Sequence, residues 1–126
     1  MRKRLTKVER QAVYDKFEGC CAYCGCELDI QDMQVDHIES IRRHESDELN
    51  GEDTTWLNKL ENLNPACRSC NFYKGEMSIE SFRKQLNGIL NRLDKVFIFR
   101  LAVKYGLIRI TPNPIRFYFE RNTLNK

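Results

Sequence analysis

Six cysteines stand out in this sequence, and four of them form two pairs with the same spacing. The pairs are Cys21-x-x-Cys24 and Cys67-x-x-Cys70. A C-x-x-C turn lets two thiolates reach one ion, and four thiolates complete the tetrahedral shell of Zn²⁺. Because protein would fill every position, we expect this zinc to be structural and not catalytic. The alternative is that these thiols are simply buried or accidental, and Cys20 and Cys26 are left over in either case.

A second group of residues has the chemistry of hydrolysis. Asp36-His37 ends a short apolar stretch, and Asn71 directly follows the second cysteine pair. A histidine that titrates near neutral pH suits a general base, and carboxylate and amide oxygens suit Mg²⁺. Each residue also has a plainer interpretation when taken singly. An Asp-His pair is commonly a hydrogen-bonded surface pair, and an asparagine after a cysteine can merely cap a helix.

The order of these motifs is more specific than any one of them. C-x-Y-C-G is followed by D-H-I, then N-L, then C-x-x-C-N-x-x-K. This series resembles the HNH nuclease family in its zinc-containing form, over roughly residues 10–78. The resemblance implies an α+β fold with a small ββα-metal (His-Me finger) core and structural zinc. It also implies hydrolysis of nucleic-acid phosphodiester bonds, by nicking or by double-strand cleavage.

The resemblance assigns roles to four positions. His37 matches the base histidine, and Asn62 matches the middle asparagine, which ties a loop so that the histidine is oriented. Asp36 and Asn71 match the two ligands of one catalytic Mg²⁺ or Mn²⁺ ion. The sequence departs from the family name at Asn71, where a second histidine would stand. The same Asp-His…Asn…Asn form occurs in the HNH domain of RNA-guided nucleases, and similar Asp-His…Asn sites occur in phage junction resolvases. A small HNH protein of this kind fits a phage or mobile element, and that origin is our family-level expectation.

Local patterns predict the elements that position these residues. Thr6 and Glu9 form a possible capping box before a helix that ends at Gly19. A β-hairpin is expected from residues 28–30 and 33–38, an exposed loop at 45–53, and a helix from about 66 to 74. Beyond Ser78 we expect one helix whose buried stripe runs to Leu93, a helix at 96–105, and two strands at 107–110 and 115–119. The nuclease core would span 1–78, and the helix-and-strand extension would span 79–126.

The positive charge is concentrated at the end of the chain. Residues 1–94 hold 14 Lys/Arg and 17 Asp/Glu, a net charge of −3, whereas residues 95–126 hold 7 and 1, a net charge of +6. We therefore expect the extension to contact DNA, through Arg109 and Arg116 among others, or else to be an ordinary solvated surface. Lys74, one helical turn after Asn71, is expected to hold a phosphate.

Composition limits the remaining alternatives. No apolar run approaches the roughly 20 residues that span a bilayer, and the charged N-terminus has no signal-peptide pattern, so we expect a cytoplasmic protein without a membrane partner. A zinc module that only binds nucleic acid or protein is the main rival, but it gives no reason for Asp36, His37 and Asn71. RNA is a less favoured substrate than double-stranded DNA because no aromatic RNA-reading platform is apparent.

Overall fold

The computed structural model of this chain describes residues 3–124. It is a small α+β structure, and its first helix, α1 (Lys7–Asp15), begins as expected. The Thr6 side chain accepts a hydrogen bond from Glu9 N, and the Glu9 carboxylate accepts one from Thr6 N, so the capping box is confirmed. The helix is shorter than predicted, because a turn from Lys16 brings the chain to Gly19 at a positive φ of 79°. Val13 on α1 packs with Met33 and Leu63 in the core.

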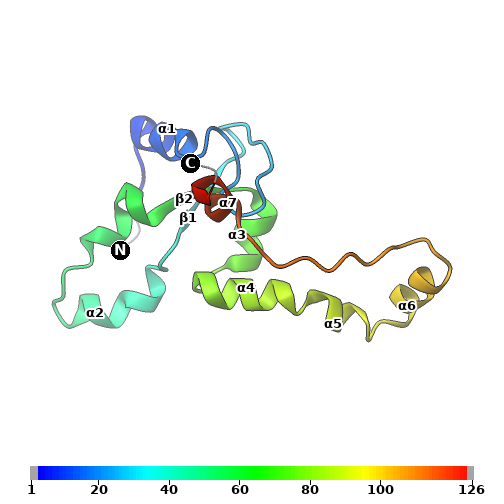
Figure 1. Ribbon diagram of the computed structural model, residues 1–126. Helices are drawn as coiled ribbons and strands as arrows, with labels where there is room; N and C mark the ends of the chain where they lie inside the picture. The colour runs from blue at the N-terminus through cyan, green and yellow to red at the C-terminus, as the bar shows by residue number, and fades with distance from the viewer. Residues whose placement is uncertain (1–2, 125–126) are drawn as a thin grey trace. The chain divides into compact units, whose positions relative to one another are not determined.

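The only sheet in the described residues pairs segments that are far apart in the sequence. Strand β1 (Gln34–His37) runs antiparallel to β2 (Leu63–Ala66), with Asp36 opposite Asn64 (Figure 1). The prediction that residues 33–38 pair with residues 28–30 in a hairpin was therefore wrong. Residues 28–30 are not a strand, because the chain turns there, with Asp32 N and Met33 N donating to Asp29 O.

Four short helices connect the two strands. They are η1 (Arg42–His44), α2 (Glu45–Leu49), η2 (Thr55–Asn58) and η3 (Leu60–Asn62). The expectation of an irregular loop at 45–53 was thus wrong for α2, although that helix has no buried residue. Lys16, at the end of α1, donates from Nζ to Leu60 O at 3.1 Å and to Leu63 O at 2.8 Å. This cation therefore holds the η3–β2 junction against α1.

Helix α3 (Arg68–Lys74) follows β2 directly and completes a ββα arrangement with the two strands (Figure 1). Its N-cap is Cys67, whose sulfur accepts a hydrogen bond from Cys70 N. Its C-cap is Gly75 at φ 53°, a conformation that favours glycine. The predicted helix at this place is confirmed, with Lys74 as its buried residue.

The end of the chain packs on the first cysteine turn. Tyr118 N donates to Tyr23 O at 3.0 Å, and Phe119 N donates to Ala22 O at 2.9 Å. Helix α7 (Tyr118–Leu124) begins here, so the strand predicted at 115–119 was wrong. The contacts group Met1–Ile79 and Arg116–Lys126 into one compact unit, which we call unit 1.

The second unit, unit 2, is Glu80–Ile115. It contains nearly all of α4 (Ile79–Asn87), together with α5 (Ile89–Leu93) and α6 (Phe97–Lys104). The long helix expected after Ser78 is divided at Gly88, and of its predicted buried stripe only Phe82 is fully buried. Helix α6 is confirmed, but residues 107–110 are not a strand. The grouping differs from the division predicted between residues 78 and 79, because it places 116–126 in unit 1. The predicted two-part organisation of the chain remains a prediction.

The helices found within residues 3–124 are all too short or too polar to cross a bilayer.

Candidate functional site

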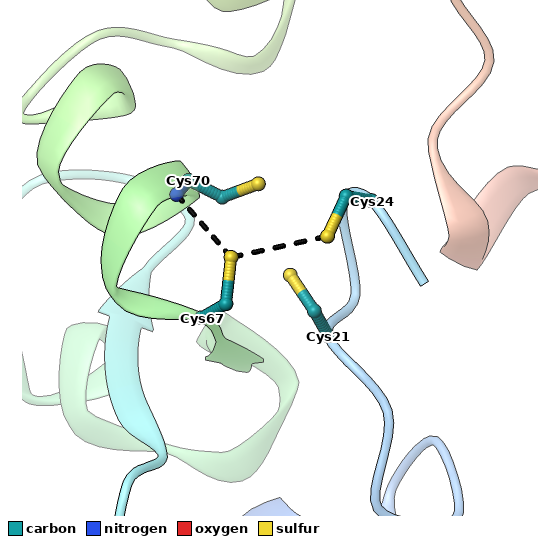
Figure 2. A group of neighbouring side chains, drawn as sticks. All are labelled: Cys21, Cys24, Cys67 and Cys70. Carbon is teal, nitrogen blue, oxygen red and sulfur yellow. Dashed lines mark hydrogen bonds between the residues drawn. The ribbon is translucent and has the colours of Figure 1, made fainter. Parts of the chain in front are cut away.

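The four paired cysteines meet in space. Their sulfur atoms all lie within 4.8 Å of one another, and Cys24 Sγ lies 3.8 Å from Cys67 Sγ (Figure 2). Cys21 and Cys24 come from the turn after α1, and Cys67 and Cys70 come from the start of α3. Ala22 N donates to Pro65 O at 2.8 Å, which fastens the first turn to β2 beside the second pair. We call these four residues the cysteine centre.

Backbone geometry prepares the sulfur atoms for a cation. Tyr23 N donates to Cys21 Sγ and Cys70 N donates to Cys67 Sγ, each at 3.4 Å. Gly25, at φ 82°, allows the tight turn in which its N–H bonds to Cys21 O. A hydrogen bond from the Cys70 thiol lowers the pKa of Cys21, which is the direction that favours the thiolate form that binds a metal. Four soft donors at these separations fit Zn²⁺.

The two other cysteines lie outside this centre. Cys20 forms an isolated β-bridge with Glu27, and Cys26 is exposed. Neither belongs to the group of ligand atoms that could share a metal among the described residues. The structure therefore supports the prediction that Cys21 and Cys24 are the first pair of ligands.

Asp36, on β1, is held by two groups in the interior. Its side chain is 3% exposed, and it accepts hydrogen bonds from the Tyr23 hydroxyl and from Lys74 Nζ, which is 3.2 Å from Oδ1 and 3.1 Å from Oδ2. Burial raises the pKa of Asp36, and the Lys74 ammonium and the Tyr23 hydroxyl oppose that rise. The carboxylate is thus oriented by a buried cation and a buried hydroxyl.

Lys74 does not lie where we expected it. Its side chain is fully buried, and besides Asp36 its ammonium donates to His37 O at 3.1 Å and Ile38 O at 3.4 Å. A phosphate contact requires an accessible ammonium, so this geometry does not support the predicted role. The residue instead neutralises Asp36 and ties α3 to the end of β1.

His37 is the last residue of β1 and is half-buried. Its Nε2 lies 3.1 Å from Oδ1 of Asn58, the last residue of η2. Because a carbonyl oxygen only accepts hydrogen bonds, Nε2 carries the hydrogen, and the lone pair of the neutral ring is on Nδ1. The Nδ1 nitrogen can therefore accept a proton.

Asn62 is 6% exposed and bridges two segments around His37. Its Oδ1 accepts a hydrogen bond from Glu39 N at 2.8 Å, and its Nδ2 donates to Glu39 O and Leu57 O, at 3.1 and 2.8 Å. These three hydrogen bonds all go to backbone groups, so Asn62 fixes the chain just after His37. This geometry supports the positioning role that was expected for Asn62.

One cavity, of about 220 Å³, brings the predicted residues together. Asp36, His37 and Asn71 all line it, with Glu76 beside them. Asn71 is half-buried on the first turn of α3. The remaining lining residues are Val35, Ser40, Ile41 and Gly75. The cavity has room for a cation that keeps several waters, and its hard oxygen donors suit Mg²⁺ or Mn²⁺.

The structure also gives the places of Arg109 and Arg116, which were predicted, and of Tyr23 and Asn58, which were not. Arg109 is exposed in unit 2 and Arg116 is exposed in unit 1. Sequence reasoning gave no role to Tyr23 or Asn58, although these side chains contact Asp36 and His37. The tyrosine of C-x-Y-C was visible in the motif, but Asn58 carried no signal, because its place beside His37 depends on how the chain folds between the strands.

Comparison with known proteins identifies part of the chain. The family model described as HNH endonuclease matches residues 21–76. A search of curated proteins finds no match to this chain. The matched segment contains both cysteine pairs and every residue named above for the cavity.

Proposed function

We propose that this chain hydrolyses phosphodiester bonds of DNA through residues 21–76, which match the HNH endonuclease family model and contain the cysteine centre. In this proposal His37 is the general base, Asn62 orients it, and Asp36 and Asn71 hold one Mg²⁺ or Mn²⁺ ion. The family supports a nucleic-acid substrate and a divalent metal. The choice of DNA, the base and the identity of the ion are our inferences.

The observation that carries the proposal is the cavity lined jointly by Asp36, His37 and Asn71. A zinc module that only binds a partner has no need to gather a base and two hard oxygen donors in one hollow. The three residues come from β1 and α3, so the ββα arrangement itself brings them together.

Each of these groups has a separate role in the hydrolysis. His37 takes a proton from a water molecule, whose oxygen then forms a bond to phosphorus while the bond to the departing 3′ oxygen breaks. The hydrogen bond between Nε2 and Asn58 Oδ1 orients the imidazole ring for this step. When bound, the divalent ion stabilises the negative charge that develops on the phosphoryl oxygens.

The cysteine centre has a different role in this proposal. Four thiolates leave Zn²⁺ no open position, so zinc there stabilises the fold and does not take part in hydrolysis. Its two halves lie before β1 and at the start of α3, and one ion therefore joins the turn after α1 to α3.

The test compares the two histidines of the chain. His37→Ala should lose at least about a hundredfold of its plasmid-cleaving activity, which is the usual contribution of a general base. His44→Ala is the matched control, because His44 does not line the cavity and should retain cleavage. Zinc content and thermal unfolding should be unchanged in His37→Ala. Full cleavage by His37→Ala would refute the assignment of the base.

The same assay separates the substrates and the ions. EDTA at a concentration that leaves zinc bound should stop cleavage, and added Mg²⁺ or Mn²⁺ should restore it. Supercoiled plasmid, linear duplex and an RNA duplex are compared, and preferential cleavage of RNA would overturn the proposal of DNA. We further propose nucleic-acid contacts by Arg109 and Arg116, a cytoplasmic location and a phage or mobile-element origin.

A further inference from the structure

Tyr23 lies between two ligands of the cysteine centre. It follows Cys21 by two positions and precedes Cys24, and its backbone N–H donates to Cys21 Sγ at 3.4 Å. Its ring is 2% exposed and lies edge-on to the rings of Phe117 and Phe119, with centroids 5.5 and 6.1 Å away. The residue is therefore fixed both by the first cysteine turn and by the end of the chain.

The far end of the same side chain reaches the other candidate metal site. The Tyr23 hydroxyl donates to Asp36 Oδ2, and it accepts a hydrogen bond from Asn64 Nδ2 at 3.3 Å. One side chain thus spans from a zinc-ligand turn to the carboxylate at the cavity.

We propose that Tyr23 is a positioning residue that couples the cysteine centre to the binding of the catalytic divalent ion. The inference rests on the proposed function in one respect, because it takes Asp36 to be a ligand of that ion. The Tyr23 hydroxyl and Lys74 hold Oδ2 and so fix the orientation of Asp36. Oδ1 accepts a hydrogen bond from Lys74 at 3.2 Å and keeps lone-pair capacity for an ion. Partners of this kind, behind a metal ligand, commonly change metal affinity by about 10- to 100-fold.

A purely structural role for the hydroxyl makes a different prediction. Tyr14 provides the comparison, because its hydroxyl donates to Leu28 O at 2.6 Å in the same unit and does not contact Asp36. Tyr14→Phe and Tyr23→Phe each remove one hydroxyl and keep the ring. Only Tyr23→Phe should change the binding of the second ion.

The experiment measures Mn²⁺ binding to zinc-loaded protein by the EPR signal of free Mn²⁺. We compare the wild type with Asp36→Asn, Tyr23→Phe and Tyr14→Phe, and zinc content and thermal unfolding are recorded for each. The expected result is that Tyr23→Phe weakens Mn²⁺ binding about tenfold or more while it retains zinc, and that Tyr14→Phe binds as the wild type does. Wild-type affinity in Tyr23→Phe would overturn the coupling.

Failure of the proposed active site gives a distinct result. If Asp36→Asn binds Mn²⁺ as tightly as the wild type, Asp36 is not a ligand and the proposed metal site itself is wrong. If Asp36→Asn loses binding but Tyr23→Phe does not, only the role of Tyr23 is refuted.

A measurement on the unaltered chain decides the matter even if Tyr23→Phe does not fold. The wild type is labelled with ¹³C at the tyrosine Cζ carbons and titrated with Mg²⁺ after zinc loading. The chemical shift of Tyr23 should change in proportion to the fraction of protein that has bound Mg²⁺, because the Tyr23 hydroxyl and the ion both contact Asp36 in this proposal. The chemical shift of Tyr14 should not change. A Tyr23 resonance that is unaffected by Mg²⁺ bound at Asp36 would overturn the inference.

Discussion

Replacing Lys74 with methionine should destabilise the fold far more than the loss of a typical lysine does. The side chain is fully buried, and its ammonium is surrounded by Asp36, His37 O and Ile38 O. Methionine fills a similar volume but donates no hydrogen bond. The substitution therefore leaves the buried Asp36 carboxylate with the hydrogen bond from the Tyr23 hydroxyl but without its cation. It also removes the hydrogen bonds that the ammonium donates to His37 O and Ile38 O.

The magnitude follows from the cost of a buried charge that loses its partner. Removing one member of a buried ion pair costs about 3–5 kcal/mol, mostly because the other charge stays desolvated. Asp36 is 3% exposed, so solvent offers it little compensation. The total stability of a domain of this size is about 5–15 kcal/mol, and the variant should therefore lose a large fraction of it.

Urea unfolding at neutral pH, with zinc present, measures this change in the free energy of unfolding. Arg42→Gln is the matched control, because the Arg42–Glu76 pair has a similar separation of 3.5 Å but side chains that are 73% and 54% exposed. Exposed pairs contribute about 0–1 kcal/mol, so the control should unfold nearly as the wild type does.

A second substitution tests the reason for the effect. Asp36→Asn in the Lys74→Met background removes the uncompensated charge and keeps an acceptor for Tyr23, so the double variant should be more stable than Lys74→Met alone. If Lys74→Met costs less than about 1 kcal/mol, or if the double variant is less stable still, the buried ion pair is not what makes Lys74 important.

Three further predictions concern the zinc, a histidine and the basic residues. Wild-type protein should contain equimolar zinc, and Cys67→Ser should be misfolded, as measured by circular dichroism. Cys26→Ser, outside the cysteine centre, should keep its zinc. A folded wild type without zinc would contradict this prediction. Hydrogen bonds to neighbouring carboxylates raise the pKa of His44 above 6.5, so its stabilisation is fully present below that pH and is lost as the pH rises through the higher folded value. His44→Gln should therefore flatten the dependence of unfolding free energy on pH above 6.5, and an unchanged profile would exclude the contribution. Changing Arg109 and Arg116 together to glutamine should reduce the slope of log DNA affinity against log salt by up to about 2, since each phosphate contact contributes about 0.9; an unchanged slope would place the DNA contacts elsewhere.

The sequence by itself was enough for the features that depend on local spacing. Two C-x-x-C turns predict a shared metal because each turn places its own pair of sulfurs, and the structure brings all four within 4.8 Å. The Thr6–Glu9 capping box was predictable for the same reason, since both partners lie within one helical turn. The order of motifs also identified the HNH domain that the family model matches at residues 21–76.

Pairing between distant segments was decided only by the tertiary structure. The apolar stretch before Asp36 predicts a strand, but nothing local selects β2 over residues 28–30 as its partner. The alternating pattern near Phe117 likewise favoured a strand. There, however, Tyr118 N and Phe119 N bond to the carbonyls of Tyr23 and Ala22 as a helix begins.

Lys74 illustrates the same limit at a single side chain. Its spacing of three from Asn71 correctly places both residues on one face of α3, because a helix repeats every 3.6 residues. Helical periodicity does not say what that face meets. Only the packing of α3 against β1 puts the buried Asp36 carboxylate beside the ammonium. A charge in the interior is stable only with such a partner, so the fold, and not the local sequence, determines whether this lysine meets solvent or a carboxylate.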